Sequence, residues 1–286
     1  MAGFVTVVLL GGLNLVAVKF SNQGLPPFYG AAVRFLIAAA LMFAFVLIRR
    51  IPLPKGRELT ATMIYGVLGF AGFYAFGYWA LVTLPAAAAG VLIASAPLIT
   101  VLLASWQKVE TLTARGLTGA VLTILGIAVM VGSPTGGVVT LGAVLAVLAA
   151  AACDAEALIV VKKMPTGDPV STNAVAMMFG AILLFALSLV ARERWSVPTD
   201  TVTLAALAYL VVLGSIALFV VYLRTLKRWT ASGMSYMFVL MPVVAAVLGY
   251  WLLDEPITQG VVLGGLIVLL GVYVGALSGG RASERS

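Results

Sequence analysis

Two acidic residues, Asp154 and Glu156, stand inside a long apolar stretch and are the first candidates for chemistry. A charged group at the centre of a membrane helix costs about 2.5–3.5 kcal/mol, so such groups are retained mainly where they have a function or a partner. Residues two apart on a helix point about 160° apart, so the two acids cannot face one cavity. We expect at least one of them, Asp154 first, to contact a substrate amine or carry a proton. The alternative is that they pair with Lys162 or Lys163 or reach the membrane surface.

Aromatic and polar side chains in other apolar stretches form a second group of candidates. Tyr74 and Tyr78 are four residues apart and share one face of a helix, and Trp79 follows directly. A tyrosine hydroxyl deep in an apolar bundle needs a hydrogen-bond partner, which cavity water or a substrate can supply. Asn14 and Ser95 are also polar, although both could instead form hydrogen bonds between helices. We predict a substrate cavity lined by Asn14, Tyr74, Tyr78, Trp79, Ser95, Asp154 and Tyr236, with core packing as the alternative for the aromatic members.

For three further charged residues we favour a structural interpretation. Arg34 lies about two turns inside its apolar stretch. Its planar guanidinium could bind a substrate carboxylate, but an arginine near a membrane surface more often extends to the lipid headgroups. Glu110 and Glu255 are each followed three residues later by a threonine, Thr113 or Thr258, just before an apolar stretch. We expect these pairs to cap helix N-termini.

The sequence lacks the residues that many catalytic and metal sites need. It has 286 residues, no histidine and a single cysteine, Cys153. A histidine-based metal site, catalytic triad or proton relay is therefore excluded, as is an internal disulfide. No phosphate-binding glycine loop or metalloprotease motif is present. We expect no cofactor and no direct use of ATP, and an intramembrane enzyme is only a remote alternative.

The candidate residues must be positioned by membrane helices, because apolar residues make up 63% of the chain, charged residues 9%, and the mean hydropathy is +1.16. A soluble domain has about 45–50% apolar and about 25% charged residues. A bilayer core requires roughly 20 apolar residues per helix. We predict an all-α polytopic membrane protein with ten spans, at Ala2–Ser21, Phe28–Ile48, Leu59–Val82, Ala86–Ser105, Leu112–Val131, Val138–Val161, Val170–Ala191, Asp200–Leu223, Thr230–Leu252 and Ile257–Leu277.

The basic residues indicate how the chain crosses the membrane. With the N-terminus in the cytoplasm, thirteen Lys and Arg fall in cytoplasmic loops and the tail and three fall outside, as the positive-inside rule requires. The net charge of +7 lies in these short loops and so indicates topology, not nucleic-acid binding. We predict a multi-pass protein of the inner (plasma) membrane with both termini cytoplasmic.

The sequence repeats itself at an offset of 145 residues. The register aligns Pro97 with Pro242, Trp106 with Trp251, Glu110 with Glu255, Thr113 with Thr258, Gly119 with Gly264 and Gly126 with Gly271. We predict two five-helix repeats, at residues 1–135 and 136–286, and an odd number of spans forces the second repeat to cross in the opposite direction. A 5+5 inverted-topology repeat is typical of alternating-access carriers, with the substrate site between the halves. Proline within a membrane helix removes a backbone hydrogen bond and kinks the helix, so we predict hinges at Pro97 and Pro242.

This pattern resembles the drug/metabolite transporter superfamily and, within it, the ten-span EamA-type branch. The resemblance rests on the proline in the fourth span of each half, the glutamate thirteen residues later, the nearby threonine and the spaced glycines, and it extends over essentially the whole chain. It implies export of amino acids or other metabolites. The tyrosine- and tryptophan-bearing third span resembles that of aromatic amino-acid exporters. Asp154 and Glu156 depart from the family, whose members usually have an aromatic or neutral pair there.

We therefore expect a secondary transporter that exports amino acids, aromatic ones included, by alternating access. The expected cavity is lined by spans one, three, four, six, eight and nine. An exporter of drugs or other small metabolites is the alternative within the superfamily. Proton coupling would have to use Asp154 or Glu156, since histidine is absent, and uncoupled export is equally compatible. The expected partners are a small-molecule substrate and the lipid bilayer, with no nucleic acid, and a monomer suffices to enclose the pathway.

Overall fold

The computed structural model describes residues 2–107, 113–132, 139–164, 167–218, 221 and 231–277, and their side chains except those of residues 2, 162 and 231–239. This part of the chain consists of helices joined by loops and contains no strand. The helices and π-helical segments are α1 (Ala2–Gly24), α2 (Pro27–Arg49), α3 (Arg57–Tyr65), η1 (Gly66–Gly72), α4 (Phe73–Ala80), α5 (Ala86–Ile93), α6 (Ala96–Trp106), α7 (Ala114–Gly132), α8 (Leu141–Lys163), α9 (Pro169–Val190), α10 (Thr201–Val211), η2 (Val212–Ala217), α12 (Ala231–Leu253), α13 (Gln259–Val272) and η3 (Tyr273–Leu277).

Seven continuous helical segments in the described residues are long and apolar enough to cross a membrane. They are Gly3–Gly24, Pro27–Arg49, Arg57–Ala80, Ala86–Trp106, Ala114–Gly132, Leu141–Val161 and Pro169–Val190. Three shorter apolar helices, Thr201–Ala217, Leu240–Leu253 and Gln259–Gly275, overlap the remaining predicted spans. The prediction of an all-helical, multi-span protein is thus confirmed for the described residues.

Helices α8, α9, α10 and α13 begin at a side chain that accepts a hydrogen bond from a backbone N–H of the first turn. Asp168 accepts a hydrogen bond from Val170 N at 2.8 Å before α9, and Thr140 accepts one from Ala143 N at 3.3 Å before α8.

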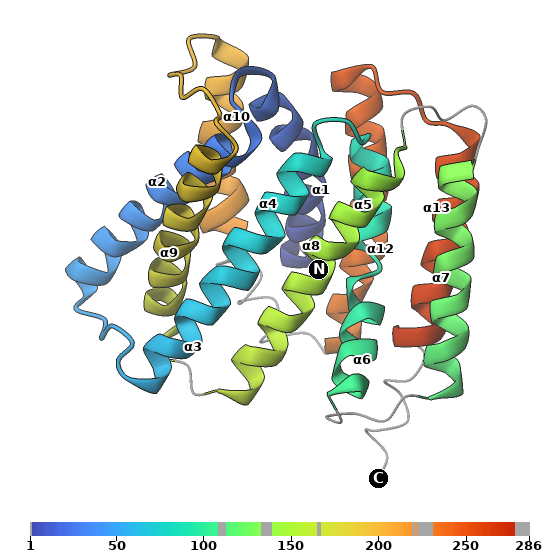
Figure 1. Cartoon of the computed structure of the whole chain (residues 1–286), viewed down its shortest axis with the longest axis horizontal. Coiled ribbons are helices and arrows are strands. Elements are labelled where there is room, and N and C mark those ends of the chain that lie inside the picture. The colour runs from blue at the N-terminus through green and yellow to red at the C-terminus, as the bar shows by residue number, and fades with distance from the viewer. Residues whose placement is uncertain are drawn as a thin grey trace.

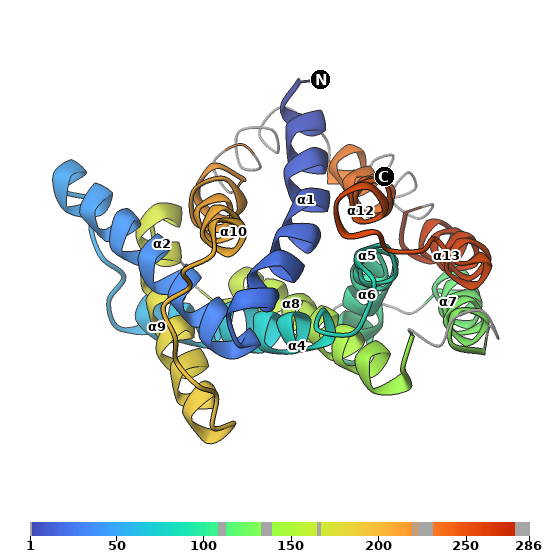
Figure 2. The ribbon, with the colours of Figure 1, turned by 90° about the horizontal axis from the view of Figure 1, so that it is seen from above.

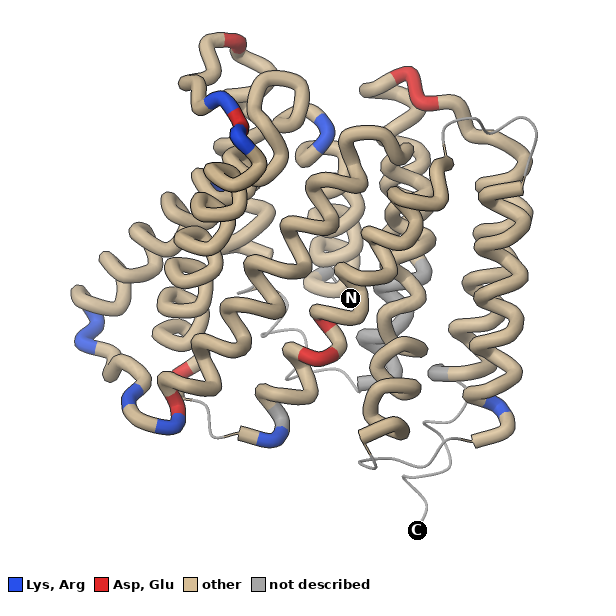
Figure 3. Tube along the Cα trace, in the orientation of Figure 1, with Lys and Arg blue, Asp and Glu red and all other residues tan. Residues whose placement is uncertain are grey.

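Figure 3 shows the charged residues gathered at the two ends of the bundle, whereas acidic positions on α8 lie between them. We call the end with the α12–α13 loop, at the top of Figure 1, the Glu255 end and the opposite end the Arg57 end.

Small residues allow the helices to approach closely. At one edge of the bundle α7 packs along α13, and on the other side α2 packs along α9, with α1 between α10 and α12 (Figures 1 and 2). A side chain on Gly126 of α7 would meet the Gly264 carbonyl of α13, and one on Gly119 would meet the Gly271 carbonyl. Backbones this close are typical of glycine-rich contacts between membrane helices.

Two of the continuous segments are irregular inside the bundle. Segment Arg57–Ala80 contains the π-helical turn η1, and segment Ala86–Trp106 is interrupted at residues 94 and 95, between α5 and α6. Pro97 lies in the first turn of α6, where its missing N–H costs nothing. Pro242 lies inside α12. The structure therefore breaks the fourth predicted span just before its proline, and hinge motion at either proline stays a prediction.

Candidate functional site

Two neighbouring cavities lie inside the bundle and share the lining residues Phe73, Tyr74 and Leu218. The Arg34 cavity, of about 190 Å³, is lined by α1, α2, α4, α5 and α12. The Asp154 cavity, of about 140 Å³, is lined by α2, α3, η1, α4, α8, α9 and η2. Helices from both ends of the sequence thus enclose the pair.

Arg34 of α2 is buried in the first cavity, with 1% of its surface exposed. Its Nε donates to Ser215 Oγ at 3.1 Å, its Nη1 to the Tyr78 hydroxyl at 3.3 Å and its Nη2 to the Gly214 carbonyl at 3.1 Å. The expectation that Arg34 extends to the lipid headgroups is therefore wrong. Its hydrogen bonds to η2 and α4 hold the guanidinium inside the bundle.

Aromatic rings complete the surroundings of this guanidinium. Its central carbon lies 4.9 Å from the Phe35 ring centroid and 5.1 Å from that of Tyr74, within cation–π range. Among the described residues, no carboxylate forms an ion pair with Arg34. A guanidinium has five N–H groups, and the three hydrogen bonds above leave two of them without a described acceptor. The cavity therefore presents positive charge and free donors.

Asn14 of α1 extends this polar cluster. Its Nδ2 donates to the Gly214 carbonyl at 3.2 Å, the same oxygen that accepts from Arg34. Its Oδ1 is buried and accepts no hydrogen bond from a described residue. Together with Tyr74 and Tyr78, Asn14 lines the Arg34 cavity. The structure thus brings three of the residues selected from the sequence into one place.

Asp154 of α8 lines the second cavity, beyond Tyr74. No described residue forms a hydrogen bond or ion pair with its carboxylate. Asn173 of α9 lies in the same wall and is buried; its Nδ2 donates to the Pro169 carbonyl at 2.8 Å, and its Oδ1 accepts from no described residue. Tyr74 lines this cavity as well as the Arg34 cavity. This cavity therefore presents negative charge and free acceptors.

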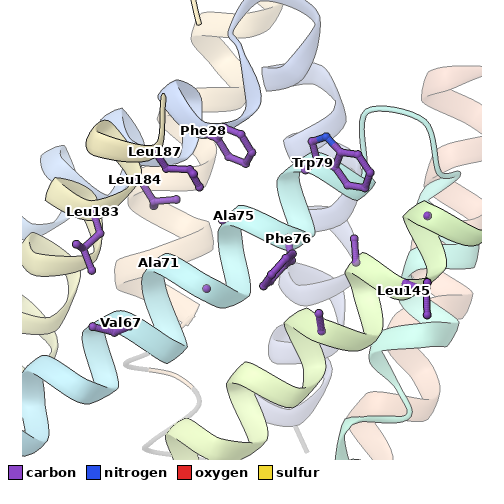
Figure 4. A pocket seen from close by; sticks show the side chains of 14 residues that line it. Phe28, Val67, Ala71, Ala75, Phe76, Trp79, Leu145, Leu183, Leu184 and Leu187 are labelled. Atoms are coloured by element: carbon purple, nitrogen blue, oxygen red, sulfur yellow. The ribbon is translucent and has the colours of Figure 1, made fainter. Parts of the chain in front are cut away.

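Trp79 lines neither cavity. It is 48% exposed and borders a separate groove of about 760 Å³ between α4, α8 and α9, together with Val67, Ala75 and Phe76 (Figure 4). Successive residues on a helix point about 100° apart, so Trp79 faces away from the side of α4 that Tyr78 occupies. Apart from the indole N–H of Trp79, this groove is lined by apolar side chains and glycine, so its walls carry no charged side chain.

Two other predicted cavity residues are placed as follows. Ser95 is buried outside both cavities, and its Oγ donates to the Leu92 carbonyl at 2.6 Å, at the end of α5. Tyr236 belongs to α12, but its side chain lies outside the described residues. The substrate role of either residue stays a prediction.

Glu156 has surroundings different from those of Asp154. Its Oε2 accepts from Gln107 Nε2 at 2.6 Å, and Gln107 Oε1 accepts from Lys163 Nζ at 2.6 Å. Glu156 is thus linked to Lys163 through Gln107 and does not line the Asp154 cavity. Direct pairing of Glu156 with Lys163 is thus not seen; its described partner is Gln107, and a proton or charge role for Glu156 stays a prediction.

The predicted threonine caps are present, whereas Glu255 has a different role. Thr113 Oγ1 accepts from Gly116 N at 3.1 Å and Thr258 Oγ1 accepts from Val261 N at 3.3 Å. Glu255 instead accepts from Ala86 N at 2.8 Å and forms a 2.5 Å ion pair with Lys19. It therefore joins the α12–α13 loop to α1 and to the first residue of α5. Glu110 lies outside the described residues.

Sequence reasoning did not select three residues that shape the cavities. Ser215 and Asn173 are polar residues within apolar stretches, the same signal that selected Asn14. Gly214 gives no such signal, because its contribution is a carbonyl and the absence of a side chain. The described residues contain no group of His, Cys, Asp and Glu that could hold a metal ion. The arrangement suits reversible binding of a small polar molecule.

Comparison with known proteins gives a consistent result. The profile of the EamA-like transporter family matches residues 1–132 and 141–276. A probable amino-acid metabolite efflux pump of Salmonella typhimurium is 27% identical over 94% of this chain and 91% of its own. An uncharacterized transporter of Archaeoglobus fulgidus is 26% identical over 94% of each chain.

Two further matches show less, because one covers only half of the chain and the other has low sequence identity. An aromatic amino acid exporter of Ancylobacter novellus is 31% identical, but over only 48% of this chain and 47% of its own. A solved crystal structure superposes with a TM-score of 0.67 over 98% of this chain and 97% of its own, at 21% identity. At that identity the similarity shows the fold alone.

Proposed function

Because the chain belongs to the EamA-like transporter family, we propose that it is a secondary transporter that exports amino acids, aromatic ones included, by alternating access. The observation that carries this proposal is the buried polar cluster of Arg34, Tyr78 and Asn14 beside the carboxylate of Asp154. Such groups are costly inside a membrane protein unless they serve a substrate or an ion. Relatives named as amino-acid metabolite efflux pumps support the choice of substrate.

Ten spans in two inverted halves, at residues 1–135 and 136–286, are part of the proposal. The family profile matches two segments of similar length. In the repeat, α1 corresponds to α8, α6 to α12, and the segment that contains α4 to the one that contains α10. Exchanging the halves in this way relates the contact of α1 with α12 to that of α8 with α6, and the contact of α8 with α4 to that of α1 with α10. Gly119 aligns with Gly264 in the repeat and packs against Gly271, whereas Gly126 aligns with Gly271 and packs against Gly264. These features support a two-fold axis between the halves, as in carriers of this design.

The topology follows from the distribution of charge. The Arg57 end carries Arg49, Arg50, Lys55, Arg57, Arg115 and Lys163, whereas the Glu255 end carries Lys19, Arg192 and Arg194. The positive-inside rule then places the Arg57 end in the cytoplasm. In the proposed topology both termini are cytoplasmic, the membrane is the inner (plasma) membrane, and one monomer encloses the pathway.

Uptake of radiolabelled amino acids into proteoliposomes tests the function. The wild type is compared with Tyr78→Ala and Asp154→Asn, with and without a pH gradient. Because Tyr78→Ala leaves Arg34 Nη1 without its partner, we expect a loss of transport of about tenfold or more. Tyr250→Ala removes an exposed tyrosine of α12 and should transport as the wild type does.

The outcomes separate the parts of this proposal. Saturable amino-acid uptake that falls in Tyr78→Ala and not in Tyr250→Ala supports the carrier and its cavity. A dependence on the pH gradient that disappears in Asp154→Asn assigns proton coupling to that residue. If the folded wild type moves no amino acid, the substrate assignment is wrong, and drugs or other small metabolites become the substrates to test.

A further inference from the structure

The two cavities differ in the sign of their charge, because Arg34 lines one, Asp154 lines the other, and neither forms an ion pair with a described residue. Arg34 is buried with no carboxylate bound to it in the described residues, and two of its N–H groups have no described acceptor. Burying a charge without a counter-charge is strongly destabilising. A protein that keeps a cation in this state, fixed by Ser215, Tyr78 and Gly214, holds a ready-made site for an anion.

The chemistry of the first cavity fits a carboxylate. A guanidinium presents its donors in a planar fork that matches the two oxygens of a carboxylate. The Tyr78 hydroxyl accepts from Arg34 Nη1, so its own O–H hydrogen remains available to a second acceptor. Donors from α2 and α4 therefore converge on one cavity.

The second cavity has the opposite character. The residues Asp154 and Asn173 both line it, and neither the Asp154 carboxylate nor Asn173 Oδ1 accepts a hydrogen bond from a described residue. An ammonium group has three donors and no acceptor, so it has enough donors for both side chains. Tyr74 and Phe73 line both cavities, so the two cavities adjoin along a shared aromatic surface.

We propose that the two cavities form one dipolar site, in which Arg34 and Tyr78 bind the carboxylate of an amino acid and Asp154 and Asn173 bind its ammonium group. This rests on the proposed function and adds a requirement, because the substrate must carry both charges. The ammonium group is either the α-ammonium or a distal one, and ligands of different charge spacing distinguish the two. A neutral drug or a simple organic anion would leave one end of the site unsatisfied.

Binding to the purified full-length protein, measured by titration calorimetry, tests the requirement without any substitution. One ligand set is L-phenylalanine, phenethylamine and 3-phenylpropionate, and the other is 6-aminohexanoate, hexylamine and hexanoate. Within each set the apolar part is matched and only the charges differ. We expect the zwitterion of at least one set to bind about tenfold to a hundredfold more tightly than both of its single-charge analogues.

Two substitutions then assign the ends. Arg34→Gln should remove the advantage of the zwitterion over the amine, and Asp154→Asn should remove its advantage over the carboxylate. The matched controls are Arg57→Gln, at an exposed arginine of α3, and Asp254→Asn, at an exposed position with φ +51° that asparagine also adopts. Both controls should keep the wild-type preference, and a thermal unfolding scan verifies that each variant is folded.

Failure of this inference differs from failure of the proposed function. If amino acids are transported but the wild type binds the single-charge analogues as tightly as both zwitterions, the dipolar site is wrong and the transporter stands. The same holds if folded Arg34→Gln and Asp154→Asn keep the zwitterion preference. If neither zwitterion binds and no amino acid is transported, the proposed function fails, and the dipolar site fails with it.

Discussion

At the scale of single residues, Gly214 is the position on which the polar cluster depends most directly. A side chain there would collide with Asn14 Oδ1 and lie 3.5 Å from Arg34 Nη2. We expect Gly214→Ala to displace both partners, to destabilise the protein by about 1–3 kcal/mol and to raise the KM for amino-acid uptake. Proteoliposome uptake and a thermal unfolding scan measure the two effects.

Gly132→Ala is the matched control, because an added carbon at this exposed end of α7 meets no atom within 4 Å. It should leave both uptake and unfolding temperature unchanged. If Gly214→Ala and Gly132→Ala have the same KM for uptake and the same unfolding temperature, the absence of a side chain at Gly214 does not matter for the site.

Of the residues predicted from the sequence to line a substrate cavity, Asn14, Tyr74, Tyr78 and Asp154 lie on the two cavities, whereas Ser95 and Trp79 do not; substrate binding by the first four stays a prediction. Sequence reasoning failed for Arg34 because α2 is apolar on every side, so no polar face marks which way a side chain points. The partners of Arg34 lie 44, 180 and 181 residues away, and a local pattern contains no trace of such contacts.

At the scale of helices, Asp200 fixes where α10 begins. Its exposed carboxylate accepts from Thr203 N at 2.7 Å, and this hydrogen bond lowers the pKa of the carboxyl group below its usual value. A lowered pKa in the folded state means that the stabilisation is complete at neutral pH and is lost as pH falls through the lowered value, below about pH 4. Asp200→Ala should therefore lower the unfolding temperature at pH 7, and its difference from the wild type should shrink in acid.

Asparagine caps helices as well as aspartate does but does not titrate. Asp200→Asn should thus match the wild type at pH 7 and keep its cap at low pH. If Asp200→Ala is as stable as the wild type at pH 7, the cap contributes nothing to the stability of α10.

The positions of the helices follow closely from apolar length and from Pro, Asp and Thr at their starts, whereas the π-helical turns do not. The kink predicted from Pro97 corresponds to the break at Ala94 and Ser95, in the turn before the proline, where Ser95 Oγ and N both bond to the Leu92 carbonyl. The π-helical turn η1 falls at Gly66–Gly72, where the Gly66 backbone packs against Ala176 of α9. Such irregularities depend on the neighbouring helix, which the local sequence does not specify.

At the scale of the whole molecule, the repeat at 145 residues is the feature that sequence alone made visible, and the structure adds how parts of the two halves meet. At the Glu255 end, Lys19 Nζ pairs with Glu255 at 2.5 Å and donates to the Leu84 carbonyl at 2.8 Å, while Glu255 accepts from Ala86 N at 2.8 Å. Both charged side chains are mostly buried. In the proposed alternating-access cycle, this link must open when the Glu255 end admits or releases substrate.

Glu255→Gln weakens this link while keeping an acceptor for Ala86 N. Loss of a charged hydrogen-bond partner costs on the order of 1.5–3 kcal/mol, which raises the population open at the Glu255 end by roughly tenfold or more. Double electron–electron resonance measures the distance between spin labels at Thr83→Cys and Ile257→Cys, in a Cys153→Ser background. In Glu255→Gln it should show a longer distance that is rarely populated when Glu255 is intact. Asp254→Asn, one residue away and exposed, should leave the distance distribution unchanged. If Glu255→Gln still transports and shows one distance, unchanged from that of the protein with Glu255, the Lys19–Glu255 pair does not hold this end closed. The contact that opens between the halves must then lie elsewhere.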